Sequence, residues 1–508
     1  MGLLHKGMQS PLKTSKSYGL LLGFLVLWSA GSGPCPAQGE PPRTPPQRLP
    51  GFDPPLLFPV EAISGNGAFF PGYPGTVFVL PVLSKKPGGG SSGESAASGG
   101  KARRNTIRIV QFARSGGTWR KLEIGDLERN SWRMGLLPLV GKDSVWTLGA
   151  AAPGLPLQGF RIGSTGSWRA VLENPPGTAF PFLSDLDGNG LPELWWLDRN
   201  GTREEGPVAV WRPAPGAPPD TPLDFRGLDL GGGFAQVLFG DFNGDLIEDL
   251  LLAGPGRKTT LVANQGGLEF DTAEDGRQPR GREGARLEAS WIRLGPRVAG
   301  RQWALARTRE APLLLARELP GGRFHPAPRQ PESLRDRGVL DARFLDCGLD
   351  GRIELCVLAA DGLRLWTLPE RGSPVLLGFL PLENGSLLRL GDLDGDHRPD
   401  LVVLRGPRPP LFLRMSPVRG DLEHGLSISL EGKEEWPHAL GAVLELVDAE
   451  GRGLEALRWP PQAPGDQACL FLGWSPLRSG LGLVVTWPDR NATEYPLRPG
   501  GHLHLKPE

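Results

Sequence analysis

The sequence has little of what several large classes of protein require. Its 56 Lys+Arg residues balance 56 Asp+Glu residues, so there is no excess of basic side chains to neutralise phosphates, and no nucleic acid partner is expected. No long segment repeats its apolar residues at the helical period. The seven His are scattered, and no Gly-x-Ser-x-Gly, His-Glu-x-x-His or phosphate-loop motif accompanies them. The sequence therefore favours neither a helical fold nor the common hydrolase chemistries.

What the sequence does have is a nine-residue acidic loop that recurs at Asp185–Glu193, Asp241–Asp249 and Asp392–Asp400. Each copy places side-chain oxygens at positions 1, 3, 5 and 9, and a backbone carbonyl at position 7 can add another. Ca2+ takes about six to eight oxygen ligands, which such a turn supplies. The candidate ligands are Asp185, Asp187, Asn189, Leu191 and Glu193; Asp241, Asn243, Asp245, Ile247 and Asp249; and Asp392, Asp394, Asp396, Arg398 and Asp400.

These loops are not EF-hands, because the closing acid is at position 9 and an apolar β-type run follows at once. The alternative interpretation is that the acids are solvated turn residues, since Asp, Asn and Gly are favoured in turns. Three near-complete copies in one frame argue against that alternative. We therefore predict about three Ca2+ sites inside β-hairpins.

A fourth, weaker copy keeps acids at Asp346, Asp350 and Glu354 but has Gly348 at position 3. A Ca2+ site here is doubtful, because one oxygen is missing. Cys347 and Cys356 flank this loop, and two cysteines opposite each other on adjacent strands can form a disulfide. We predict such a bridge in place of a tight metal, with two buried thiols as the alternative.

The loops indicate a repeat architecture. Their first positions fall at 185, 241, 346 and 392, a period of roughly 40–60 residues, which is typical of four-stranded propeller blades. A unit near Trp291–Ala306 is expected to have lost its acids, and Gly125–Asn130 is interpreted as a decayed copy. One or two glycines also precede an aromatic residue at Gly117–Trp119, Gly166–Trp168, Gly267–Phe270 and Gly322–Phe324. We predict an all-β, seven-bladed propeller, with six or eight blades as alternatives.

The chain ends suggest export and a second module. Basic residues precede the apolar run Tyr18–Trp28 and a small-residue segment, which is typical of a secretory signal, with a signal anchor as the alternative. The predicted organisation is a signal peptide at 1–37, a Pro-rich linker at 38–56, a propeller at 57–417 with a flexible loop at 84–104, and a β-sandwich-like module at 418–508. No stable membrane span is expected after the signal is removed.

The acidic loops and the Gly-aromatic marks resemble FG-GAP/VCBS repeats, which form integrin α-chain propellers. The tail resembles the ASPIC/UnbV domain at Gly441-Ala442, Leu472-Gly473 and Val485–Asp489, although Arg490 replaces the usual Gly. The whole arrangement is similar to the cartilage acidic protein family. The resemblance implies a secreted, extracellular or periplasmic scaffold that binds a protein or glycan at the cell surface or outside the cell. The alternative is a propeller enzyme of the hydrolase, lyase or dehydrogenase type.

Overall fold

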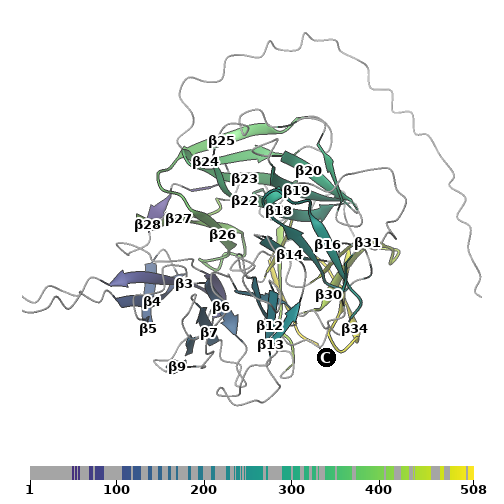
Figure 1. Cartoon of the computed structure of the whole chain (residues 1–508), viewed down its shortest axis with the longest axis horizontal. Helices are drawn as coiled ribbons and strands as arrows, with labels where there is room; N and C mark the ends of the chain where they lie inside the picture. Colours follow the sequence, from purple (N-terminus) through teal and green to yellow (C-terminus); the bar gives the residue numbers. More distant parts are fainter. Residues whose placement is uncertain are drawn as a thin grey trace, which may run out of the picture. The chain divides into compact units, whose positions relative to one another are not determined.

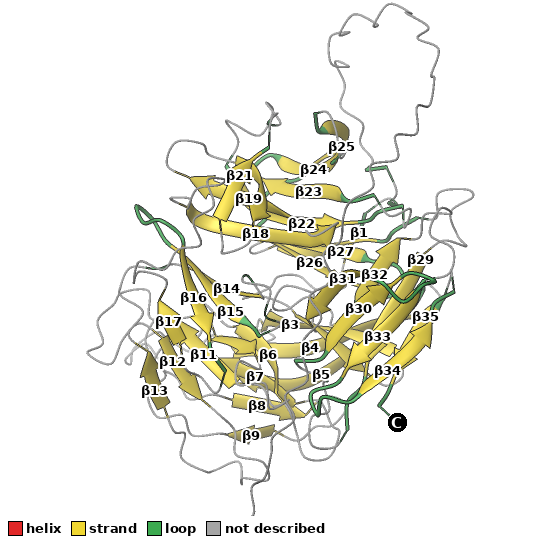
Figure 2. Ribbon diagram, turned by 90° about the vertical axis from the view of Figure 1, so that its right-hand side faces the viewer, coloured by secondary structure: helices red, strands yellow, loops and turns green. Residues whose placement is uncertain are grey.

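The structure is a computed structural model. It describes residues 49–57 and 234–508, each with gaps, and between residues 68 and 228 it describes mainly the strands. The chain divides into two compact units, Met1–Thr44 and Pro45–Glu508. The first unit, with the predicted signal peptide at 1–37, and most of the predicted loop at 84–104 lie outside the described residues. The regular elements described are all strands (Figure 2). In this part of the chain, no helix is long and apolar enough to cross a membrane.

Seven four-stranded antiparallel sheets precede the C-terminal strands in the described chain (Figure 1). Six of them consist of four consecutive strands. The first three sheets hold β2 (Ala68–Gly72), β3 (Gly75–Ser84), β4 (Thr106–Ser115) and β5 (Thr118–Leu127); β6 (Gly135–Leu139), β7 (Thr147–Ala151), β8 (Gln158–Arg161) and β9 (Ser167–Arg169); and β10 (Pro181–Ser184), β11 (Glu193–Leu197), β12 (Val208–Trp211) and β13 (Phe225–Leu228).

The next three sheets follow the same order of strands. They hold β14 (Gln236–Gly240), β15 (Asp249–Ala253), β16 (Thr260–Asn264) and β17 (Phe270–Thr272); β18 (Ala289–Val298), β19 (Arg301–Thr308), β20 (Leu314–Leu319) and β21 (Arg323–Pro326); and β22 (Val339–Leu345), β23 (Glu354–Ala359), β24 (Gly362–Thr367) and β25 (Val375–Pro381).

The seventh sheet takes its fourth strand from the other end of the chain. It holds β26 (Leu387–Gly391), β27 (Asp400–Arg405), β28 (Arg408–Leu413) and β1 (Leu56–Leu57). Leu56 lies opposite Phe412 in an antiparallel pair, and Phe52 forms a further bridge with Met415. Leu49 and Phe52 are buried in the same core. The beginning of the repeat region is thereby tied to its end.

The first strands of neighbouring sheets contact one another. The contacting pairs are β2 with β6 and β26, β6 with β10, β14 with β18, β18 with β22, and β22 with β26. Side chains reinforce two of these junctions. Gln236 on β14 bonds both the N–H and the C=O of Ile292 on β18 at 2.8 Å. Buried Asp341 on β22 accepts from Arg293 of β18 and from the Leu388 amide of β26, both at 2.9 Å. The predicted all-β, propeller-type fold class is confirmed, and the number of blades in a ring stays a prediction.

The repeat marks occupy fixed places in the sheets. All four acidic loops connect a first strand to a second strand, and the four Gly-aromatic marks lead into the fourth strands β5, β9, β17 and β21. The interpretation of Gly125–Asn130 as a decayed loop is wrong, because Asp126 lies inside β5 opposite Arg108. The unit near Trp291–Ala306 does form a sheet. There a tight hairpin pairs Val298 with Arg301 in place of an acidic loop.

The apolar runs after the acidic loops become the second strands of their sheets. β15 and β23 are buried along their whole length, and β27 is buried except at its last residue. A strand covered on both faces needs a continuous apolar sequence rather than an alternating one. Burial of such strands is expected to contribute about 25 cal/mol for each Å² of apolar surface removed from water. The acidic loops that begin at Asp241, Asp346 and Asp392 are therefore each followed by a buried strand.

The C-terminal strands form two further sheets with a core of their own. One holds β29 (Gly425–Leu430), β32 (Leu470–Gly473) and β35 (His502–Leu505), and the other holds β30 (Val443–Val447), β31 (Gly453–Arg458), β33 (Gly482–Thr486) and β34 (Ala492–Pro496). Trp487, 2% exposed, lies in their shared core. Arg490 adopts a left-handed φ of 67°.

Candidate metal centre

The loop at Asp392–Asp400 connects β26 to β27, and its backbone wraps around the first carboxylate. Oδ1 of Asp392 accepts the amides of Gly395 and Asp396 at 2.8 and 3.0 Å, and Oδ2 accepts the amide of His397 at 2.8 Å. Gly395 and His397 take left-handed φ values of 77° and 66° to bring these amides inward. A glycine adopts this conformation without steric cost, whereas a residue with a Cβ does not.

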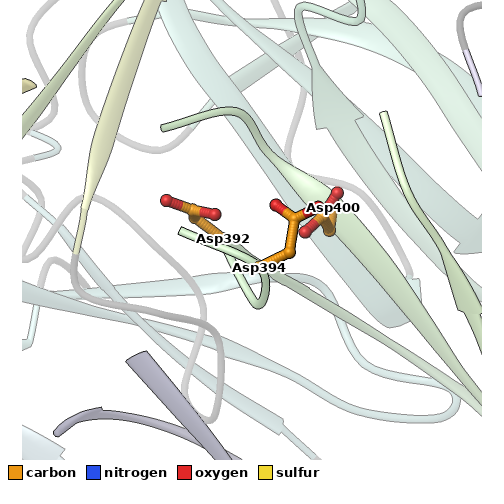
Figure 3. Close-up of side chains that lie close together, drawn as sticks. All are labelled: Asp392, Asp394 and Asp400. Carbon is orange, nitrogen blue, oxygen red and sulfur yellow. The ribbon is translucent and has the colours of Figure 1, made fainter. Parts of the chain in front are cut away.

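Three of the loop's four carboxylates converge. One oxygen from each of Asp392, Asp394 and Asp400 lies within 4.8 Å of the others (Figure 3). Asp392 is 5% exposed and Asp400 is fully buried, so these are not solvated turn residues. Asp396 is not in this group, and its Oδ2 instead accepts from Nη2 of Arg414 at 3.0 Å. The predicted four-carboxylate site is therefore a group of three, with the fourth acid turned to an arginine.

The electrostatics of this group favour a bound cation. The pKa of Asp392 is raised to about 7, mainly by burial and also by the charges of Asp396 and Asp394, against the opposing backbone hydrogen bonds. Burial and the charges of Asp394, Asp392 and Asp396 raise the pKa of Asp400 well above its ordinary value. Carboxylates whose ionisation is opposed by burial and by one another are a donor set that a hard dication can neutralise. The residues present thus fit the Ca2+ that the sequence predicts.

The acid at position 9 has a structural role that recurs in three loops. The amide of position 2 donates to it from Phe242 to Asp249 at 3.0 Å, from Cys347 to Glu354 at 2.8 Å and from Leu393 to Asp400 at 3.0 Å. In two loops, the second oxygen of this acid accepts another backbone amide at or just after the end of the third strand. Asn264 donates to Asp249 and Met415 donates to Asp400, both at 2.9 Å. Sequence reasoning assigned these acids to metal alone. The signal in the sequence was that an apolar residue stands seven positions before the acid in each of these loops.

The other predicted loops are described less completely. In the loop at Asp241, the described ligand candidates are Asp245, whose Oδ1 accepts the amide of Ile247 at 2.8 Å, and buried Asp249. Asp241 and Asn243 lie outside the described residues, as does the loop from Asp185 to Pro192. In the fourth loop Asp346 and Glu354 are buried, and Asp350 lies outside the description. Calcium binding at these three loops stays a prediction.

The predicted disulfide between Cys347 and Cys356 is wrong. Both are buried thiols that form no disulfide. The strand register explains why, because Cys356 on β23 lies opposite Arg343 on β22, whereas Cys347 lies two residues beyond the end of β22. The alternative of two buried thiols is the one observed. Burial raises the pKa of the Cys356 thiol, so this group is a weak nucleophile and a weak metal ligand.

A cation that the sequence reasoning missed is Arg414, directly after β28. Its Nε contacts Oδ2 of Asp394, its Nη2 contacts Asp396 at 3.0 Å, and its Nη1 lies 3.8 Å from Asp53. The backbone of Arg414 is held in place by the Asp53 amide, which donates to its carbonyl at 2.8 Å. The sequence near Asp392 does not predict this contact, because Arg414 lies 18 residues beyond Asp396.

The C-terminal strands contact the loop through a histidine stack. The rings of His397 and His502 are 4.8 Å apart and tilted by only 11°. The His502 ring also lies between the hydroxyls of Ser427 and Ser429, at 2.8 and 2.9 Å. Burial, followed by the neighbouring His397 and His504, lowers the pKa of His502 to about 4. The imidazole of His502 is therefore neutral at physiological pH.

Comparison with known proteins identifies no family. No family model and no curated protein matches the sequence, so the resemblance to FG-GAP/VCBS repeats and to ASPIC/UnbV stays a prediction. Solved structures with a similar arrangement include BBS1N in complex with ARL6DN, with a TM-score of 0.40 and 14% identity over 63% of this chain and 89% of that one.

Two further structures are similar at the same level. YCF48 bound to D1 peptide has a TM-score of 0.43 and 12% identity over 74% of this chain and 99% of that one. A lectin of Agrocybe aegerita that recognises terminal N-acetylglucosamine has a TM-score of 0.40 and 12% identity over 60% and 87%. The fold assignment rests on the sheets described above rather than on these likenesses.

Proposed function

We propose that the chain is a secreted, calcium-stabilised β-propeller scaffold that binds an extracellular or cell-surface protein or glycan. The observation that carries the calcium part is the convergence of Asp392, Asp394 and Asp400 within 4.8 Å in a site where burial holds the pKa of Asp392 at about 7. Export rests on the basic and apolar segment that ends at Trp28. A binding role rests on the propeller-type architecture, which hosts many binding proteins but implies no particular reaction.

The chain's own residues prepare the site before any ion arrives. Three backbone amides fix the carboxylate of Asp392, and two amides fix Asp400, one from Leu393 after the first strand and one from Met415 after the third. These acids would hold the ion together with Asp394, and the ion would add positive charge beside the buried carboxylates. Neutralising the group removes the repulsion among the carboxylates and joins β26 to β27 more firmly. The expected consequence is a stiffer sheet rather than a chemical step.

Thermal unfolding of the full chain tests the calcium part. Excess Ca2+ should raise the melting temperature relative to excess chelator, because an ion that binds only the folded state stabilises it. Asp392→Asn should reduce this shift, whereas Asp346→Asn serves as the control in a loop without a position-3 oxygen. Equal melting temperatures in Ca2+ and chelator for the unmodified chain would refute the proposal.

The enzyme alternative has one observation in its favour. Ser429 Oγ lies 2.9 Å from Nδ1 of His504, whose Nε2 lies 2.7 Å from a carboxylate oxygen of Glu431. A serine hydrolase needs such a series of groups. Here the parallel pairing of Ser429 with His504 already accounts for the contact, and Lys506 also holds Glu431 at 2.8 Å. We expect no labelling by a serine-directed fluorophosphonate; labelling that Ser429→Ala abolishes would support the enzyme alternative.

A further inference from the structure

Arg414 is placed where it can compete with a metal ion. Its guanidinium contacts Asp394 and Asp396, the acids at positions 3 and 5 of the loop. The side chain of Asp394 is 10% exposed and that of Asp396 is 21% exposed, so neither ion pair is fully screened by water. One unit of positive charge from the protein itself therefore already neutralises part of the loop.

Arg414 contacts one acid inside the metal group and one outside it. Asp396 contacts Arg414 and lies outside the group of Asp392, Asp394 and Asp400, whereas Asp394 contacts Arg414 and belongs to the group. A hard dication and a guanidinium both bind the ionised carboxylate, and they compete for the same two oxygens.

We propose, resting on the calcium site proposed above, that Arg414 is a built-in competitor that lowers the cation affinity of the Asp392 loop. When the ion is absent, Arg414 neutralises positions 3 and 5. When an ion binds, the guanidinium gives up one or both of these acids. The number of acids in the loop therefore overstates its affinity, because part of their charge is already compensated.

Asp53 allows a second test, in which the expected change in metal affinity has the opposite sign. It lies 3.8 Å from Nη1 of Arg414, on the segment that pairs with Met415 next to β1. Asp53 draws part of the guanidinium charge away from the loop. Removing it should strengthen the hold of Arg414 on Asp394 and Asp396 and should thus weaken metal binding. A purely structural role for Arg414 predicts no such opposite signs.

Calorimetric titration of the full chain with Ca2+ tests this. Asp185→Asn and Asp241→Asn are introduced first, because they remove the position-1 acids of the other two near-complete loops. In this background, Arg414→Gln should lower the Kd roughly tenfold, since a competing charge beside the ligands is gone. Asp53→Asn should raise the Kd roughly twofold, and Arg414→Lys should lie between Arg414→Gln and the unchanged residue. Arg408→Gln is the matched control, because Arg408 on the same region of chain pairs with exposed Glu383 at 2.8 Å.

The outcomes separate the inference from the proposed function. A lower Kd for Arg414→Gln together with a lower melting temperature in chelator supports the inference, as does binding by Arg414→Gln when the background chain shows none. An equal or higher Kd for Arg414→Gln, with the background chain still binding Ca2+, overturns the inference alone. No Ca2+ binding by either chain overturns the calcium site itself and the inference with it.

Discussion

Asp341 on β22 and Asp392 after β26 are both buried carboxylates close to the last sheets, and they are neutralised differently. Asp341 is fully buried and bonds Arg293 and Arg343 at 2.9 and 3.0 Å. Burial alone would raise its pKa, but the two arginines outweigh it and lower the value to about 2. Burial raises the pKa of Asp392 to about 7 instead. For the first carboxylate the arginines outweigh burial, whereas for the second burial outweighs the hydrogen bonds that oppose it.

This difference separates a structural acid from a candidate ligand. A buried ionised group needs compensation from somewhere. Asp341 obtains it from neighbouring sheets and thereby ties β18, β22 and β26 together. Asp392 obtains hydrogen bonds from its own loop and lies 3.7 Å from Nδ1 of His397, yet its pKa is raised rather than lowered, so a bound ion can add compensation. The following predictions test whether the two acids differ in this way.

The largest effect is expected at Asp341. Asp341→Ala should destabilise the chain by about 3–5 kcal/mol, because it leaves two arginines near the core without their partner. The loss should be the same in Ca2+ and in chelator, as measured by urea unfolding in both buffers. Glu383→Ala, which breaks an exposed pair with Arg408 at 2.8 Å, is the control and should cost less than about 1 kcal/mol. A strong calcium dependence of the Asp341→Ala effect would break the comparison.

The effect of Asp392→Asn should depend on the buffer. In Ca2+ at about a hundredfold excess over Kd, it should remove up to about 2.7 kcal/mol of ligand-derived stability. In chelator its effect should be much smaller, because the lost repulsion from Asp394 and Asp396 offsets the lost acceptor for one backbone amide. Urea unfolding in the two buffers measures both effects. Destabilisation of equal size in both buffers would show that Asp392 is a structural acid like Asp341.

The pH dependence should also differ in direction. Asp392 binds its proton more tightly in the folded chain, so in chelator its contribution falls as pH rises from about 4 to about 7. This amounts to about 1.4 kcal/mol per pH unit at most. Asp341 binds its proton less tightly when folded, so its contribution is complete above about pH 4 and is lost as pH falls toward 2. Unfolding of the unmodified chain and of Asp392→Asn between pH 5 and pH 7 measures the first slope. Parallel curves for the two chains would contradict it.

The sequence could predict the loops but not these partners. The acids of the Asp392 loop lie within nine residues, and their spacing placed them correctly between a first and a second strand. Asp341 and Arg414 depend on residues that only the folded chain brings near, such as Arg293, 48 residues from Asp341. The predicted disulfide failed for a related reason, because it required a strand register that the sequence does not specify. The sequence predicted the turns, whose residues are neighbours in the chain, but it did not predict which side chains meet across different sheets.

The smallest expected effect concerns how the C-terminal strands hold the Asp392 loop. The backbone of His397 has a left-handed φ of 66°, which is unfavourable for a residue with a Cβ. Its ring stacks on that of His502, with 4.8 Å between the ring centres. His502→Ala should cost about 0.5–1 kcal/mol through the lost ring contact, and hydrogen exchange of the His397 amide should quicken. His397→Gly relieves the backbone strain but also removes the stack, so it should be nearly neutral. In a His397→Gly chain, His502→Ala should have almost no further effect, because its partner ring is absent. A full additive loss in the double variant would show that His502 acts elsewhere, and that the loop geometry around Asp392 is set by its own backbone alone.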